Sequence, residues 1–168
     1  DIVRLLIKNH NLHVLKDALQ SGVSFTTYHI STIMYPVITL RPGKEESLLR
    51  HHPWVFSGAI ASSTEELEEG EYVTVTDCRG SVLGFGHYQK GSIRVRILGF
   101  GTDTMPDDFF FNRLNNAAAL RRALGMIRPD NNCFRLVHGE GDFLPGLVVD
   151  IYGDTAVMQA HSPGMHFE

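Results

Sequence analysis

Residues 71–89 read EYVTVTDCRGSVLGFGHYQ and predict a β-hairpin. The first seven residues alternate polar and apolar side chains, as a half-buried strand does, and an Arg-Gly pair suits the turn that follows. Residues 92–100, SIRVRILGF, alternate again, which puts Arg94 and Arg96 on the strand face opposite the apolar one. Together with a short strand at 37–40 and Gly-rich turns, this pattern is typical of a small β-barrel.

The hydrophobic period changes in the second half of the chain. Residues 107–125 carry apolar side chains at helical spacing, and residues 133–161 contain three stretches that predict strands. The expected fold class is therefore mainly β / α+β, with a small β-barrel followed by an incomplete α+β domain. We predict an extension of uncertain origin at 1–33, the barrel at 34–104, and a truncated α+β domain at 105–168.

Residues 1–33 leave two interpretations open. Apolar residues at helical spacing between positions 12 and 19 predict a short helix there. The segment is either a native extension or sequence that precedes a natural start at Met34, where the motif-bearing part of the chain begins.

Bulk composition limits the classes of protein that the chain fits. A content of 43% hydrophobic and 20% charged residues is ordinary for a globular protein, and no stretch approaches the roughly 18 consecutive apolar residues of a membrane span. The first residues lack a signal-peptide pattern, so we expect a cytoplasmic protein with no membrane partner. The formal net charge of −4 gives no general affinity for DNA, although a local basic cluster would still attract RNA phosphates. We expect Cys78 and Cys133 to be reduced, partly buried thiols, because they have no metal-binding or redox spacing.

The sequence contains no complete catalytic constellation. GFGHYQ at 84–89 lacks the third glycine of a dinucleotide fingerprint and falls within the predicted hairpin, not at a strand-to-helix turn. No P-loop, HExxH or GxSxG motif occurs, and the nine histidines are scattered. We therefore predict neither a metal site nor a catalytic residue in this chain.

Residues 138–154, HGEGDFLPGLVVDIYGD, carry the carboxylates that come closest to acid/base candidates. Two of them flank a glycine in a predicted turn, where carboxylates commonly accept backbone N–H bonds, so a structural role is favoured. The Pro-Gly pair has the composition of a type II turn. Asp150 interrupts an apolar run, so it is either solvated at a strand end or buried and paired. The residues to which we assign structural turn roles are Glu140, Asp142, Pro145, Gly146 and Asp150.

HPWVFSG, residues 52–58, is the strongest candidate for a binding surface. Trp54 and Phe56 follow arginine and histidine side chains, and RNA-binding sites combine flat stacking surfaces with cations. Arginines on the polar face of the strand at 92–100 would extend a basic strip for phosphates. The alternative is that Trp54 and Phe56 are core residues of the barrel. The RNA-binding candidates are Lys44, Arg50, His52, Trp54, Arg94 and Arg96.

Three blocks of sequence, taken together, resemble the N-terminal portion of the PUA-containing class I methyltransferases. Residues 41–60 are similar to the opening of the family's PUA domain, and residues 71–98 are similar to its strands. Residues 135–159 resemble the family's central α+β domain, with one departure: Phe143 stands where that family usually has a glycine. The family includes the bacterial large-subunit rRNA methyltransferase that forms 5-methylcytosine.

The resemblance implies that RNA binding and catalysis are divided between domains. In that family S-adenosylmethionine (SAM) and the catalytic cysteine are held by a C-terminal Rossmann-like domain, which has no counterpart in this sequence. There a cysteine thiolate adds to carbon 6 of cytosine, carbon 5 takes the methyl group from SAM, and a base removes the carbon 5 proton. Cys78 and Cys133 fall in the accessory domains, so the resemblance assigns neither as the nucleophile. We therefore expect the RNA-binding front half of an enzyme that methylates carbon 5 of a cytosine in 23S rRNA.

This expectation has consequences and rivals. The chain alone should be inactive and should bind no SAM, while its parent uses SAM and binds rRNA, with homodimer formation left open. One alternative is a stand-alone PUA-type RNA-binding module without catalytic activity. Another is a PUA-like domain that binds a protein or a small ligand.

Overall fold

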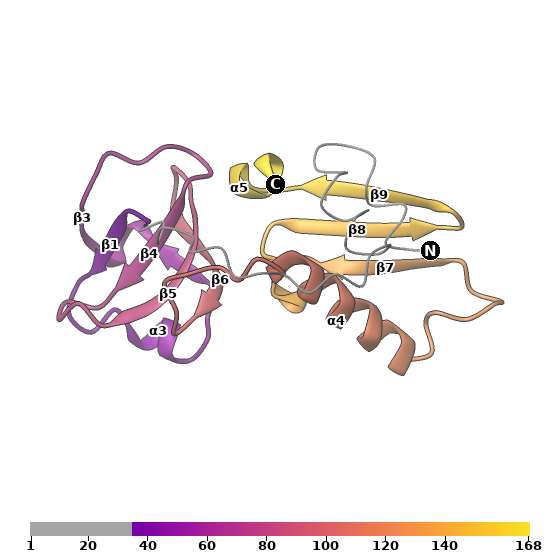
Figure 1. The fold of residues 1–168 in the computed structure, drawn as a ribbon. Coiled ribbons are helices and arrows are strands. Elements are labelled where there is room, and N and C mark those ends of the chain that lie inside the picture. The colour runs from indigo at the N-terminus through magenta and orange to yellow at the C-terminus, as the bar shows by residue number, and fades with distance from the viewer. Residues whose placement is uncertain (1–34) are drawn as a thin grey trace, which may run out of the picture.

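The computed structural model describes residues 35–168, which form two β-sheets joined by a short connection (Figure 1). The predicted extension at 1–33 lies outside the described residues. The first sheet has six strands and the second has three. This arrangement confirms the predicted fold class, a small barrel followed by an α+β unit.

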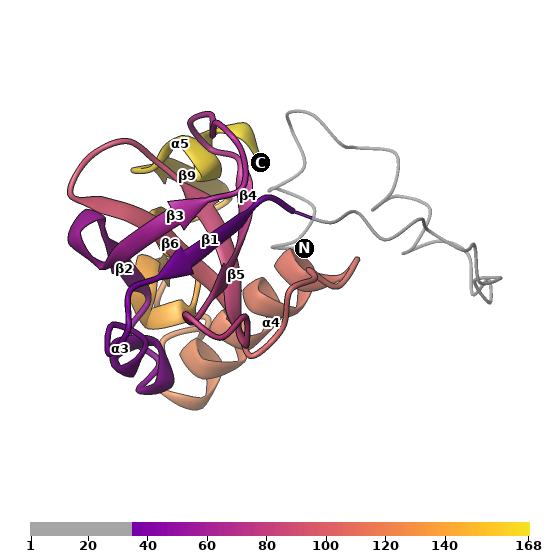
Figure 2. The same cartoon turned by 90° about the vertical axis from the view of Figure 1, so that its left-hand side faces the viewer.

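The six-stranded sheet curls on itself into a half-barrel. Its strand order is β2-β6-β5-β4-β1-β3, so β2 and β3 are the two edges of the sheet. Only the 3-10 helix η1 separates these two strands in the chain, and the edges must therefore lie close together. Figure 2 views the molecule from the barrel side. The elements are β1 (Val37–Leu40), α3 (Glu46–Leu49), β2 (Trp54–Phe56), η1 (Ser57–Ala59), β3 (Ile60–Ser63), β4 (Tyr72–Thr76), β5 (Val82–Tyr88) and β6 (Ile93–Phe100).

The hairpin of β4 and β5 forms where the sequence predicts it. Asp77 closes the turn, because its Oδ1 accepts bonds from the backbone N–H groups of Ser81 and Arg79 at 2.8 Å each. These bonds lower the pKa of Asp77. Gly86, part of the GFG sequence, lies so close to β6 that a Cβ there would collide with the carbonyl oxygen of Arg96. This glycine therefore serves close strand packing, and the GFG sequence lies inside β5, away from any turn from strand to helix.

The second unit is a helix packed on an antiparallel sheet of order β7-β8-β9. Val137, Val149 and Ile151 are buried on the helix side of this sheet, and Ala117 and Ala118 of the helix pack in the same cluster. The helix ends before Gly125, whose φ of 67° a residue with a side chain rarely adopts. The elements are α4 (Phe109–Ala123), β7 (Cys133–His138), the 3-10 helix η2 (Gly139–Asp142), β8 (Leu147–Tyr152), β9 (Thr155–Ala160) and α5 (Pro163–Phe167).

The two units share one apolar cluster. Phe85 and Leu98 of the barrel pack with Phe109, Leu144 and Met165 of the second unit. Burial of side chains of this size contributes about 1.5–3 kcal/mol each, so this packing fixes the barrel against the second sheet. The proposed domain boundary at residues 104 and 105 stays a prediction.

The end of the described chain also docks on the barrel. Gly164 of α5 packs directly against the ring of His87, which is fully buried in β5. The Tyr72 hydroxyl donates a hydrogen bond to the Glu168 carboxylate, and His87 Nε2 lies 3.4 Å from the same oxygen. Burial and the contact with Glu168 raise the pKa of Tyr72 well above its usual range.

The structure shows the surroundings of the two cysteines and the character of the helices. Cys78 and Cys133 are free and exposed, which corrects their predicted partial burial. Cys78 lies in the hairpin turn and Cys133 at the first position of β7, and neither place is covered by another element. Within residues 35–168, no helix combines the length and apolar character needed to cross a membrane.

Candidate nucleic-acid interface

Strand β2 presents an aromatic surface on the outside of the barrel. Val55 points into the core, so Trp54 and Phe56 project from the opposite face. Trp54 is half-buried and Phe56 is 47% exposed. The ring of His52 lies 5.6 Å from Trp54 and 6.3 Å from Phe56, and Trp54 meets Phe56 edge to face at 6.2 Å. We call His52, Trp54 and Phe56 the aromatic ladder; the alternative that both larger rings are core residues is wrong for Phe56.

A recess of about 320 Å³ opens beside the aromatic ladder. Helix α3 and η1 form its other walls, and the exposed side chain of Lys44 lies at its rim. Its volume lies at the lower end of the range of small-molecule pockets, about 300–1,000 Å³. The lining residues are Lys44, Ser47, Leu48, Trp54, Val55, Phe56, Gly58 and Ala59.

The two cations before β2 remain accessible to a ligand. Arg50 pairs with Glu46 at 2.7 Å on the exposed face of α3. Such surface pairs contribute only about 0–1 kcal/mol, so a phosphate can displace the carboxylate. Lys44 makes no ion pair within the described part of the chain.

The two arginines of β6 are less accessible than the strand pattern predicts. Arg94 donates from Nη1 to the Tyr88 hydroxyl at 3.1 Å. The Arg96 side chain is only 14% exposed and donates from Nε to Gln89 at 3.1 Å and from Nη1 to Glu140 at 3.1 Å. The strand period does place Arg96 on the outer face, but η2 of the second unit lies against that face and covers it.

Glu140 reaches the barrel, although a structural role within its own turn was expected. Its Oε1 accepts the indole N–H of Trp54 at 2.8 Å as well as the Arg96 bond. Trp54 and Arg96 are directly opposite each other in the β2–β6 pair, and the Arg96 guanidinium carbon lies 5.7 Å from the Trp54 ring centroid. Two side chains of the barrel thus donate to one carboxylate oxygen of the second unit.

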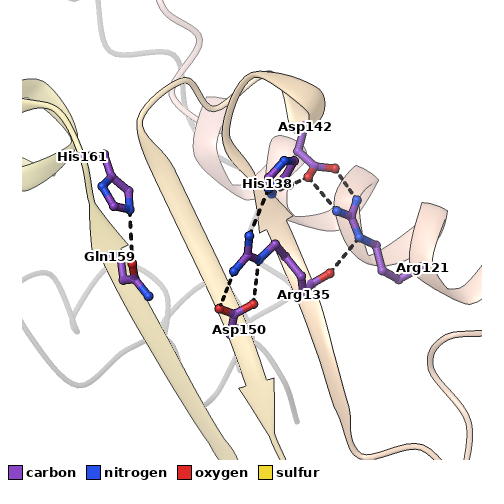
Figure 3. Close-up of polar contacts among 7 residues, drawn as sticks. All are labelled: Arg121, Arg135, His138, Asp142, Asp150, Gln159 and His161. Carbon is purple, nitrogen blue, oxygen red and sulfur yellow. Dashed lines mark hydrogen bonds and ion pairs between the residues drawn. The ribbon is translucent and has the colours of Figure 1, made fainter.

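Asp142 connects its own turn to strand β7 and helix α4. It accepts the backbone N–H of His138 at 2.6 Å (Figure 3). It also forms a bidentate ion pair with Arg121 of α4, with Nη2 and Oδ2 at 2.8 Å, and both side chains are buried. Arg121 in turn donates from Nε to the carbonyl oxygen of Arg135 at 3.0 Å. Sequence reasoning missed Arg121, although its spacing of three and four residues from Ala118 and Ala117 places it on the buried side of the helix.

Asp150 matches neither of its two alternatives in full, because it is paired within β8 while its side chain stays partly exposed. Arg135 of β7 donates to both of its oxygens, at 2.8 and 2.9 Å (Figure 3). These hydrogen bonds from Arg135 lower the pKa of Asp150. Arg135 Nη1 also lies 3.3 Å from Nδ1 of His138.

A second hollow, of about 660 Å³, lies beside these pairs. The carboxylates that line it are ion-paired with Arg121 and Arg135, so their charges are already offset within the protein. Within residues 35–168 the residues do not fit a Rossmann-type SAM site, which needs a Gly-rich turn from strand to helix. The described residues also contain no cluster of three metal-binding side chains. The hollow is lined by Leu120, Arg121, Leu124, Met126, Arg135, His138, Gly141, Asp142 and Asp150.

A tight turn that contains Pro145 and Gly146 precedes β8. The Leu147 N–H donates to the Leu144 carbonyl at 3.0 Å, and Gly146 has a φ of 89°. Phe143 adopts a φ of 57°, a left-handed conformation that favours glycine. Its ring is 53% exposed and lies 5.1 Å from the guanidinium of Arg113. This geometry accounts for the glycine that the related family usually has here.

The first part of the described chain is similar to a known family of domains. Residues 38–100, the curled six-stranded sheet, match a family described as a PUA-like domain. Two solved structures share the fold at 14% sequence identity. One is a candidate SAM-dependent methyltransferase from Streptococcus mutans, with a TM-score of 0.64 over 78% of this chain and 34% of that one. The other is SMU.776, a candidate methyltransferase in complex with SAH, with a TM-score of 0.62 over 78% of this chain and 33% of that one.

Curated relatives are more similar in sequence. The chain is 40% identical over 133 residues to the ribosomal RNA large subunit methyltransferase I of Erwinia tasmaniensis, covering 78% of this chain and 33% of the relative. It is 42% identical over 130 residues to the protein of the same name from Alteromonas mediterranea, covering 76% and 32%. The resemblance to PUA-containing rRNA methyltransferases is therefore confirmed, and the chain spans about a third of the length of these relatives.

Proposed function

We propose that the half-barrel binds single-stranded RNA through the aromatic ladder and the adjoining recess, as one part of a SAM-dependent rRNA methyltransferase. The observation that carries this proposal is the exposed face of β2, where three flat rings stand beside a recess with Lys44 at its rim. Unstacked bases pack on such rings, while nearby cations hold the phosphates. The PUA-like match and the names of the curated relatives support the same class of ligand.

The finer identity of the reaction belongs to the proposal as well. We propose that the whole enzyme methylates carbon 5 of a cytosine in 23S rRNA, in the cytoplasm, with SAM as the methyl donor. The described residues do not fit a SAM site, so the donor would be held by another part of the enzyme. This chain would then bind and orient RNA but transfer no methyl group by itself. Dimer formation by the parent enzyme stays a prediction.

RNA binding is tested by titrating the chain against a fluorescently labelled single-stranded RNA and following anisotropy. Trp54→Ala should weaken binding by about 5- to 100-fold, because each base stacked on an aromatic ring contributes about 1–3 kcal/mol. Tyr152→Ala is the control, since Tyr152 is an exposed aromatic ring on the other sheet, away from the proposed interface. Equal losses in the two variants, or no binding by the unaltered chain at about 50 mM salt, would overturn the proposed interface.

The mass of the endogenous protein distinguishes the methyltransferase from a stand-alone RNA-binding module. An endogenous polypeptide of about 40–45 kDa would have room for one further domain of ordinary size and would support the methyltransferase. A mass near the 18.8 kDa of this chain would support the stand-alone module. Transfer of labelled methyl groups from SAM to protein-free 23S rRNA by the endogenous protein, mapped to its base, tests the cytosine assignment.

A further inference from the structure

We infer that Glu140 is a positioning residue for RNA recognition: this carboxylate of the second unit fixes Trp54 of the barrel for stacking and holds Arg96 behind it. The inference rests on the proposed RNA-binding function. It gives a role in recognition to a side chain outside the half-barrel and predicts that the barrel depends on its neighbour for full affinity.

The carboxylate anchors the Trp54 ring by its polar edge. The indole N–H donates to Glu140 Oε1 at 2.8 Å, and the Arg96 guanidinium lies over the ring. His52 and Phe56 contact the same ring edge to face, which leaves it little freedom to rotate. Holding a side chain in its bound orientation before the ligand arrives removes an ordering cost of about 0.5–1.5 kcal/mol from binding.

Arg96 belongs to the support of the ring more than to the phosphate contacts. Its guanidinium is largely buried, and it donates to Gln89 and to Glu140. The charge of Glu140 offsets that of Arg96 at 3.1 Å, so the pair presents little net charge to RNA. The predicted basic strip is therefore interrupted at this point, and Arg96 orients Trp54 from below.

The position of Glu140 is itself fixed from the second unit. It lies in η2, and Asp142 two residues later binds both the His138 N–H and the buried Arg121. The short helix is thus tied to β7 and α4 at one end, while Glu140 contacts the barrel from the other. This connection couples the orientation of the second unit to the surface on which RNA would stack.

The anchor can be read directly, because Trp54 is the only tryptophan of the chain. Glu140→Ala and the more space-filling Glu140→Met both remove the acceptor, whereas Glu140→Gln keeps a carbonyl oxygen for the indole N–H. In the folded proteins, as judged by circular dichroism, the first two variants should lower the steady-state anisotropy of Trp54 emission and shift its maximum. Glu140→Gln should stay close to the unaltered protein.

The direction in which RNA affinity changes then distinguishes a positioning role of Glu140 from a purely electrostatic one. Glu140 is an anion beside a polyanion-binding surface, so charge alone predicts that all three variants bind RNA more tightly. Positioning predicts that Glu140→Ala and Glu140→Met bind about 2- to 10-fold more weakly, while Glu140→Gln restores or exceeds the original affinity. In a Trp54→Phe background, which lacks the indole N–H, the further loss on changing Glu140 to Met should disappear.

The outcomes separate this inference from the function on which it rests. If the unaltered chain does not bind RNA, the proposed function fails, whatever the fluorescence shows. If it binds and Glu140→Met binds as tightly as Glu140→Gln, or Trp54 emission is the same in all variants, the positioning role is overturned. Should Glu140→Ala not fold, Glu140→Met and the Trp54→Phe background carry the test.

Discussion

The barrel and the second unit differ in how far their cationic side chains are paired. On the barrel, Lys44 lies at the rim of the recess and has no ion-pair partner among the described residues, and Arg50, at the end of α3, has only an exposed one. In the second unit, Arg121 and Arg135 are each bound by two oxygens of an aspartate. Glu140 of the second unit, in contrast, pairs with Arg96 and accepts the indole N–H of Trp54, both of the barrel.

If the half-barrel binds RNA as proposed, this difference assigns the phosphate contacts to the recess and structural support to the ion pairs of the second unit. A cation that is bound bidentately has little left to offer a phosphate, since its donors and its charge are already used. An unpaired lysine beside exposed rings keeps both. We therefore expect changes at the ion pairs of Arg121 and Arg135 to affect mainly stability, and changes around the recess to affect mainly RNA affinity.

The largest expected effect is on stability, at the buried pair of Asp142 and Arg121. Asp142→Ala leaves the Arg121 guanidinium buried without its counterion and the His138 N–H without its acceptor. Removing one partner of a buried ion pair typically lowers the free energy of unfolding by about 3–5 kcal/mol. Urea denaturation followed by circular dichroism measures the loss.

The matched control removes both charges. Asp142→Leu combined with Arg121→Met should be much less destabilised than Asp142→Ala, because no buried charge is left alone. A single variant as stable as the unaltered protein would show that Arg121 reaches water when its partner is lost, and the contrast between the barrel and the second unit would weaken.

The next effect concerns the salt dependence of RNA binding. Lys44→Ala should reduce the slope of log affinity against log salt by about 0.7, the value for one phosphate contact on a single strand. Arg135→Ala should leave the slope unchanged, since its charge is held by Asp150. Titrations between about 50 and 200 mM salt measure both slopes. A larger change in Arg135→Ala than in Lys44→Ala would place the phosphate track on the second sheet.

Local patterns in the sequence predicted most of the fold but only part of the interface. Strand alternation, the Pro-Gly turn and the helix at 109–123 depend on neighbouring residues, so the chain itself carries their signal. The bond from Trp54 to Glu140 joins positions 86 apart, and no local period encodes it. Alternation alone likewise placed Arg96 on an exposed face, because it does not register the second unit that covers it.

A smaller effect concerns Phe143, which adopts a left-handed conformation in the second unit. Phe143→Gly should raise the free energy of unfolding by about 0.5 kcal/mol. The left-handed conformation disfavours a side chain by about 1–2 kcal/mol, and glycine relieves this strain. The greater entropy of the unfolded glycine chain and the lost contact with Arg113 offset most, but not all, of this gain. Phe143→Ala loses the ring and keeps the strain, so it should be less stable than Phe143→Gly by about 1 kcal/mol. Thermal unfolding compares the two. If alanine is the more stable variant, strain at φ 57° is not what sets the preference at this turn.

The smallest effect is a pH dependence at Asp150, which alternates along β8 with the buried Val149 and Ile151. The hydrogen bonds from Arg135 lower the pKa of Asp150 in the folded protein. Stability from this pair is therefore fully present above the ordinary aspartate pKa of about 3.9 and is lost as the pH falls through the lower folded value. Asp150→Asn should be less stable than the unaltered protein at neutral pH, and the two melting temperatures should converge in acid. Because Arg135 is well exposed, solvent screening keeps the difference small. If the difference in melting temperature persists unchanged below the folded pKa of Asp150, Asp150 stabilises β8 by packing. The second unit would then depend on its ion pairs less than the buried pair of Asp142 and Arg121 indicates.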